Sequence, residues 1–203
     1  MKLLANAVAM PHLSAAICID PNSRARRTTM PPAVFLLLRF IHVVIGVAWA
    51  GSVIFIAMFL FPTLKATGPN GGAVMTYLTQ VKRMPAYLMG GVILTILSGL
   101  ALYWNDSAGF SSQWMSSGPG RTFGFGGVMG ILVAIIGGAV NAPTATRMGE
   151  IGAEIKAAGG PPTAAQAAEL ERLSGKMTMA MRATAVLLFL AITAMAVARY
   201  VPA

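Results

Sequence analysis

The stretch that decides the fold runs from Ala33 to Pro62 and reads AVFLLLRFIHVVIGVAWAGSVIFIAMFLFP. About 20 consecutive apolar residues already cross the hydrocarbon of a bilayer, so this stretch is too long and too apolar for a helix in a water-soluble core. We expect it to span a membrane. Its two polar groups that are costly to bury in hydrocarbon are Arg39 and His42.

The composition places the whole chain in the same class. Of its 203 residues, 56% are hydrophobic and only 10% are charged, and the mean hydropathy is +0.71. These values are typical of a polytopic membrane protein. The formal net charge is +9, but Lys and Arg stand singly at the ends of apolar runs, as they do where membrane helices meet water. We therefore expect a lipid bilayer around the chain and no nucleic acid.

Four apolar stretches predict an all-α, four-helix transmembrane bundle in one domain, residues 30–203. The spans are expected at about residues 33–62, 85–104, 122–143 and 183–200. Pro62 lacks a backbone donor and is expected to end the first helix. Tyr103 and Trp104, at the end of the second span, are expected to lie at the membrane interface.

A polar helical hairpin is predicted between the third and fourth spans, over residues 145–182. The sequence Gly159-Gly160-Pro161-Pro162 predicts its turn, and Thr163 is a candidate N-cap for the second arm. The arms carry charges of both signs, which indicates a surface in contact with water. We find no pair of carboxylates in them that suggests catalysis.

Residues 1–29 are interpreted as a peripheral tail, with Met30 as an alternative start of the mature protein. Lys and Arg are more frequent on the side of the first connector and the hairpin. The residues counted there are Lys65, Lys82, Arg83, Arg147, Lys156, Arg172, Lys176 and Arg182. The positive-inside rule then predicts a bacterial inner-membrane protein with the hairpin in the cytoplasm and both termini in the periplasm.

Small residues recur at a spacing of four on three of the spans. They are Gly46 and Ala50 on the first, Gly91, Thr95 and Gly99 on the second, and Gly126, Gly130, Ala134 and Gly138 on the third. Small residues at this spacing let two membrane helices approach closely. We expect these faces to pack against one another or against a partner.

His42 is the candidate centre of a functional site. Arg39, His42, Gly46 and Trp49 share one helix face. A neutral imidazole about nine residues into a span either donates a hydrogen bond to a neighbouring helix or coordinates a metal. With haem iron, His42 would be a ligand, Gly46 would make room, Trp49 would stack and Arg39 would lie near the propionates. The shared face leaves both interpretations open.

A second haem ligand would have to be a methionine, because no other span contains histidine. Met129 and Met195 lie at about the depth of His42 on the third and fourth spans and are the candidates. A copper site is the alternative, because thioethers suit Cu(I). Met177 and Met181 share a helix face while Met179 points elsewhere, so the three would converge only in an unwound segment.

The segment LRFIHVVIGVAWAG, Leu38 to Gly51, resembles the opening helix of the CopD-like bacterial membrane proteins, a group similar to the haem-associated HemJ proteins. The shared features are an early histidine, a Trp-x-Gly motif beginning at Trp49, and a proline at the helix end, Pro62. The polar hairpin and the ending AMAVARY are also similar. The resemblance implies a four-helix inner-membrane protein in which His42 binds haem b or takes part in copper handling.

These observations lead to three functional hypotheses. The first is a non-catalytic inner-membrane protein that binds haem b or copper through His42, since the sequence contains no nucleotide-binding, zinc-protease or serine-nucleophile motif. The second is an accessory subunit of a respiratory or photosynthetic complex, packed against other membrane subunits or against copies of itself. The third, a small-solute transporter, is less favoured because no span contains an acidic residue or a visible break.

Overall fold

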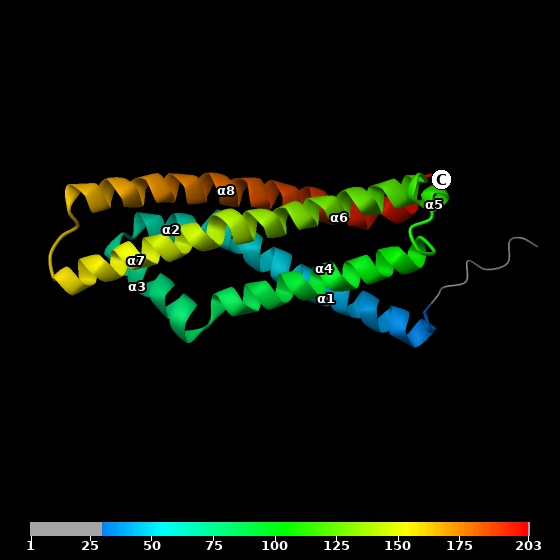
Figure 1. The fold of residues 1–203 in the computed structure, drawn as a ribbon, viewed down its shortest axis with the longest axis horizontal. Coiled ribbons are helices and arrows are strands. Elements are labelled where there is room, and N and C mark those ends of the chain that lie inside the picture. Colours follow the sequence, from blue (N-terminus) through cyan, green and yellow to red (C-terminus); the bar gives the residue numbers. More distant parts are fainter. Residues whose placement is uncertain (1–29, 203) are drawn as a thin grey trace, which may run out of the picture.

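The computed structural model describes residues 30–202, and every regular element within that range is a helix. Four continuous helical stretches are long and apolar enough to cross a membrane: Pro32–Ala66, Met84–Asp106, Gly118–Ala158 and Ala164–Tyr200. They run up and down the long axis of the molecule (Figure 1). The all-α fold with four helices able to span a membrane is therefore confirmed, whereas the predictions for residues 1–29 lie outside the described residues.

Shorter elements make up these stretches. The first consists of α1 (Pro32–Phe55), η1 (Ile56–Leu60) and α2 (Phe61–Ala66), and the connector holds α3 (Pro69–Thr76) and η2 (Tyr77–Val81) before α4 (Met84–Asp106). The remaining elements are α5 (Ser112–Met115), α6 (Gly118–Ile136), η3 (Gly137–Asn141), α7 (Ala142–Ala158), α8 (Ala164–Val197) and η4 (Ala198–Tyr200).

Proline does not end the first helix, so that expectation was wrong. A proline ring collides with the carbonyl one turn back, and its nitrogen cannot donate. Here the wider π-turn η1 precedes Pro62 and resets the hydrogen-bond register, with Phe61 N–H donating to Ile56 O. The π-turn η3 precedes Pro143 in the same way. The third span and the first arm of the hairpin are consequently one helix.

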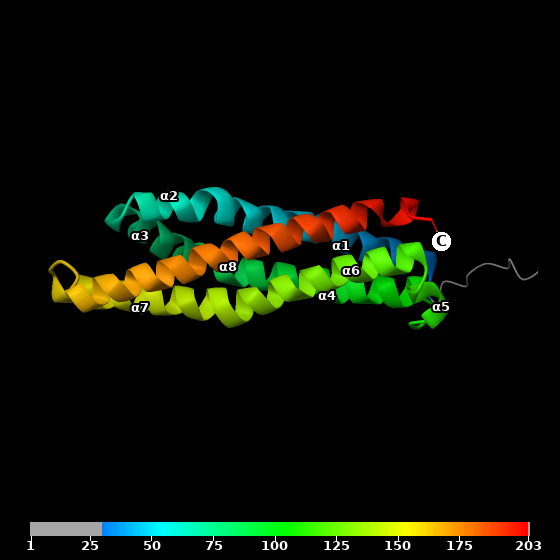
Figure 2. The ribbon, with the colours of Figure 1, turned by 90° about the horizontal axis from the view of Figure 1, so that it is seen from above.

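The helices associate as two pairs, α1 with α4 and α6 with α8, with fewer contacts between the pairs. Figure 2 shows α6 and α8 running side by side toward the end that carries α5. A small buried core joins the two pairs and contains Trp49, Ala50, Val133 and Leu188. The interior is thin, so most of the apolar surface faces outward.

At one end of the molecule, α7 and the first half of α8 form the predicted polar hairpin. Gly159 ends α7 with φ of 66°, a conformation that glycine adopts without strain. Thr163 begins α8 with a capping box in which Thr163 and Gln166 each bind the other's backbone N–H, which confirms the predicted N-cap. Lys65 of α2 bonds Glu171 of α8 at 3.1 Å, so the first connector and the hairpin lie at the same end.

The opposite end is closed by the connector after α4. The Tyr103 hydroxyl donates to the Gly120 carbonyl at 3.2 Å, and its ring meets Trp114 edge-on, with the centroids 5.2 Å apart. Trp104 is 41% exposed. Of the two aromatic residues expected at the interface, Trp104 faces outward, whereas Tyr103 packs inward on the connector.

Candidate functional site between α1 and α4

His42 of α1 contacts the backbone of α4. Its Nδ1 lies 2.9 Å from the Thr95 carbonyl oxygen and 3.4 Å from the Ser98 hydroxyl. A carbonyl oxygen can only accept, so Nδ1 carries the hydrogen and donates it to Thr95. In the neutral imidazole, the other nitrogen, Nε2, then keeps a free lone pair.

Three glycines allow α1 and α4 to approach closely enough for this contact. A Cβ atom at Gly99 would lie 2.7 Å from His42 Cε1, one at Gly46 would lie 3.3 Å from Thr95 Cγ2, and one at Gly91 would lie 3.1 Å from Trp49 Cβ. Real Cβ atoms are found this close rarely or never. The three glycines therefore lie where the two helices approach most closely, the packing device of membrane helices.

The other residues on the His42 face have different surroundings. Trp49 is 6% exposed, and its indole rests against Gly91 inside the core that joins the helix pairs. Arg39 is half-buried one turn before His42, and within residues 30–202 no ion pair includes it. The stacking role that haem would require of Trp49 conflicts with this packing.

The two methionines proposed as second ligands lie on the other helix pair. Met195 packs against α6, where its Cγ and Cε would lie 3.2 Å from a Cβ at Gly126. Met129 lies half-buried on α6 itself. Met195 thus contributes to the contact between α6 and α8, and His42 contributes to the contact between α1 and α4.

The methionine run at residues 177–181 does not converge on one point. It lies within α8, a helix of 34 residues. Met177 is 3% exposed and Met179 is 76% exposed, so their side chains lie on different faces of the helix. Met181 is half-buried. A copper site at Met177 and Met181 would have to do without Met179, because α8 is not unwound here. No group of three or more His, Cys, Asp or Glu side chains in the described part of the chain could hold a metal ion.

Of the three predicted packing glycines on the third span, one makes a close contact within the chain. A Cβ at Gly126 would lie 3.2 Å from the Ala191 carbonyl oxygen, whereas positions 130 and 138 have no neighbouring atom within 4 Å. Gly130 and Gly138 are therefore open within this chain, and their expected packing against a partner stays a prediction. Residues spaced by four are rotated by about 40° around the helix axis at each step. A straight neighbouring helix that contacts the first residue of such a series therefore does not stay in contact with the later ones. Gly138 also lies in η3, where the register changes again.

Sequence reasoning missed Ser98, which is 4% exposed and lies beside the His42 ring. Its hydroxyl donates to the Leu94 carbonyl at 2.5 Å. The available signal was its position seven residues after Gly91, which places it on the same helix face. Asn141 and Thr144 were also missed. Each has a buried side-chain oxygen with no hydrogen-bond partner among the described residues.

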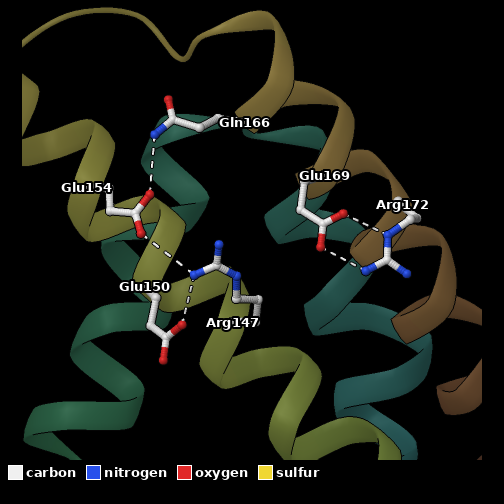
Figure 3. A network of polar contacts seen from close by, with 6 residues as sticks. All are labelled: Arg147, Glu150, Glu154, Gln166, Glu169 and Arg172. Carbon is white, nitrogen blue, oxygen red and sulfur yellow. Dashed lines mark hydrogen bonds and ion pairs between the residues drawn. The ribbon is translucent and has the colours of Figure 1, made fainter.

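The hairpin carries a second group of polar contacts (Figure 3). Arg147 binds Glu150 at 3.0 Å and Glu154 at 3.6 Å, and Gln166 donates to Glu154 at 3.4 Å, which links the two arms. On α8, Arg172 binds both carboxylate oxygens of Glu169, at 2.7 and 2.8 Å. The hydrogen bond from Arg172 lowers the pKa of Glu169. These groups are exposed, so each pair stabilises the hairpin only slightly.

Comparison of the chain with protein-family models, with curated proteins and with solved structures finds no match. The resemblance to the CopD-like proteins therefore stays a prediction.

Proposed function

We propose that the chain is a non-catalytic structural subunit that packs against other membrane subunits and presents the α7–α8 hairpin to water. The observation that carries this proposal is the outward-facing apolar surface. Few residues are buried within the chain in the most apolar 18-residue stretch of each span: 11% in each of the first three spans and 28% in the fourth. Such faces require lipid or a partner to cover them.

The polar groups inside the spans support the same function. The Nδ1 atom of His42 binds the backbone of α4, and the Ser98 hydroxyl binds its own helix. The His42 bond holds α1 against α4, and neither contact gathers acids, bases and nucleophiles around a substrate-sized space. Packing is the role that these contacts perform directly.

The length of α8 supports a role for the hairpin in contacting a partner. Its 34 residues extend over about 51 Å at the helical rise, while the hydrocarbon layer is about 30 Å thick. Roughly 20 Å of helix therefore extends beyond the apolar layer at the hairpin end. By the positive-inside rule, that end faces the cytoplasm of a bacterial inner membrane.

A second candidate function is the binding of haem b or copper through His42. The hydrogen bond from Nδ1 to a backbone carbonyl is the second-shell arrangement that orients a metal-bound histidine, with Nε2 left as the ligand. The residues fit a single protein ligand, because Trp49 lies in the core and Met195 lies in the other helix pair. This candidate ranks second for that reason.

One purification tests both functions. The full chain is extracted from its native membrane in a mild detergent, and its mass by light scattering and its visible spectrum are recorded. We expect a colourless chain that co-purifies in fixed ratio with at least one other membrane protein. Extraction of the chain with no other protein bound to it would contradict the structural-subunit function. A Soret band or bound copper that is lost in His42→Ala and kept in the matched Met129→Leu variant favours the second candidate.

A further inference from the structure

A basic cavity of about 380 Å³ lies between the end of the first span and α8. Its wall includes two cations, Lys65 from α2 and Arg182 from α8, together with Thr178 and the ring of Pro62. Ala57 of η1 also lines it, so the π-turn before Pro62 forms part of the wall.

Both cations stand where apolar sequence meets polar sequence. Lys65 follows the apolar run of residues 33–62, and Arg182 immediately precedes the apolar run of residues 183–197. The two runs are antiparallel neighbours in the bundle, so the cavity opens at the level of the lipid headgroups on the hairpin side. Long basic side chains at this level reach toward phosphate while their stems stay on apolar surface.

The charge balance at the cavity favours an anion. Lys65 is paired with Glu171 at 3.1 Å, but these side chains are 48% and 73% exposed. An exposed pair of this kind is held weakly and can be exchanged for another anion. Glu171 lies eleven positions before Arg182, about 16 Å along α8, so it neutralises only the Lys65 end. Arg182 is in no ion pair among residues 30–202.

We propose that this cavity binds the phosphate group of an anionic phospholipid from the leaflet on the hairpin side. Exposed apolar side chains continue toward the membrane centre on the same two helices and can hold the acyl chains. They include Met58 and Phe59, each 60% exposed, and Val186 and Phe189, 60% and 68% exposed. A soluble anion would use the two cations but not these side chains, which is why the lipid is the occupant. Basic pockets between helices are a known way to hold anionic headgroups.

The test is native mass spectrometry of the full chain in detergent, titrated with dioleoyl-phosphatidylglycerol or, separately, with the zwitterionic dioleoyl-phosphatidylcholine. We expect the chain to retain phosphatidylglycerol preferentially. Arg182→Gln and Lys65→Gln should each weaken that binding about fivefold, because each removes one cation near the phosphate. Glu171→Gln should strengthen it, since Lys65 is then released from its pair.

Lys176→Gln is the matched control, because it removes one positive charge from α8 at a position that does not line the cavity. Its binding should equal that of the unaltered chain. Equal losses in Lys176→Gln and Arg182→Gln would mean that general surface charge attracts the lipid, and would overturn the proposal. Inorganic phosphate that displaces the lipid at millimolar concentration would assign the cavity to a soluble anion instead. If Arg182→Gln fails to fold, two other variants test the proposal. Thr178→Val should bind phosphatidylglycerol more weakly, and Glu171→Gln should bind it more strongly.

Discussion

The two helix pairs of this molecule are held together by different means. In the α1–α4 pair, the imidazole of His42 donates to a backbone carbonyl of the neighbouring helix. In the α6–α8 pair, Gly126 faces the Ala191 carbonyl and the Met195 thioether, and within residues 30–202 no side-chain hydrogen bond joins these two helices. Both pairs contain a close backbone approach at glycine. This shared feature is what association in lipid requires, because apolar side chains gain little there by leaving the lipid tails.

The two pairs also have different support beyond the apolar layer: Met30 N–H donates to Asn105 Oδ1 at 3.2 Å at one end of the first pair, and the second pair is supported at the hairpin. It continues into the α7–α8 hairpin, where the Thr163 capping box and the contact of Gln166 with Glu154 hold the two arms. The first pair ends at the α2–α3 connector instead. The polar contact at His42 gives the first pair a side-chain hydrogen bond between its helices within the apolar layer.

The largest expected effect comes from filling the close approaches. Gly91→Leu and Gly126→Leu should each lower the free energy of unfolding by about 2–3 kcal/mol, because the added side chain meets Trp49 or the backbone of Ala191. Gly130→Leu is the control and should change little, since its Cβ position is open. Thermal unfolding in detergent measures all three. An equal loss at Gly130 would show that the stripe as a whole, and not its close contacts, sets stability.

A smaller effect is expected from the polar contact. His42→Ala should cost about 1–2 kcal/mol, the upper part of the range for hydrogen bonds between membrane helices, with a contribution from the lost ring packing. Hydrogen exchange followed by mass spectrometry should show faster exchange in α1 and α4 and unchanged exchange in α6. His42→Gln, which keeps a donor, should recover part of the protection. Faster exchange spread evenly over all four spans would contradict the division into pairs.

The smallest effect is a pH dependence confined to the hairpin. The Glu169 pKa is lowered by its hydrogen bond from Arg172, below the ordinary value of 4.5. A carboxyl group with a lowered pKa in the folded state stabilises the fold above that ordinary value and loses this contribution as the pH falls through the lowered one. As the pH falls from 5 to 3, we expect slightly weaker protection against exchange in the first turns of α8, after correction for the intrinsic pH dependence of amide exchange. Glu169→Gln should remove this pH dependence. An undiminished pH dependence in that variant would mean that another group causes it.

Much of the architecture could be predicted from sequence because bilayer thickness sets the length of an apolar run. The four spans, the hairpin and the Thr163 cap follow from run length and from local capping chemistry. The meeting of His42, Gly46 and Trp49 with Gly91, Thr95 and Gly99 was predicted only as a set of matching faces. Which faces would pair depends on contacts between segments about fifty residues apart, and helical periodicity carries no information about those.

One sequence expectation was wrong because it applied a local rule where the surrounding structure decides. Pro62 and Pro143 lie within continuous helices, because a π-turn before each one relieves the clash. Gly130 and Gly138 lie on the same predicted stripe as Gly126 but meet no neighbour within this chain, so their packing against a partner stays a prediction.

The sequence by itself determined that this chain is of the membrane-protein class and has four helices long and apolar enough to cross a bilayer, because helix length scales with residue number and a helix satisfies its own backbone groups in hydrocarbon. Only the tertiary structure decided that the His42 ring binds α4, that Met195 packs away from that ring, and that Lys65 and Arg182 line one cavity. Those outcomes depend on how helices rotate about their own axes when they pack. That rotation follows from the sum of many weak contacts between distant segments, which no single stretch of sequence contains.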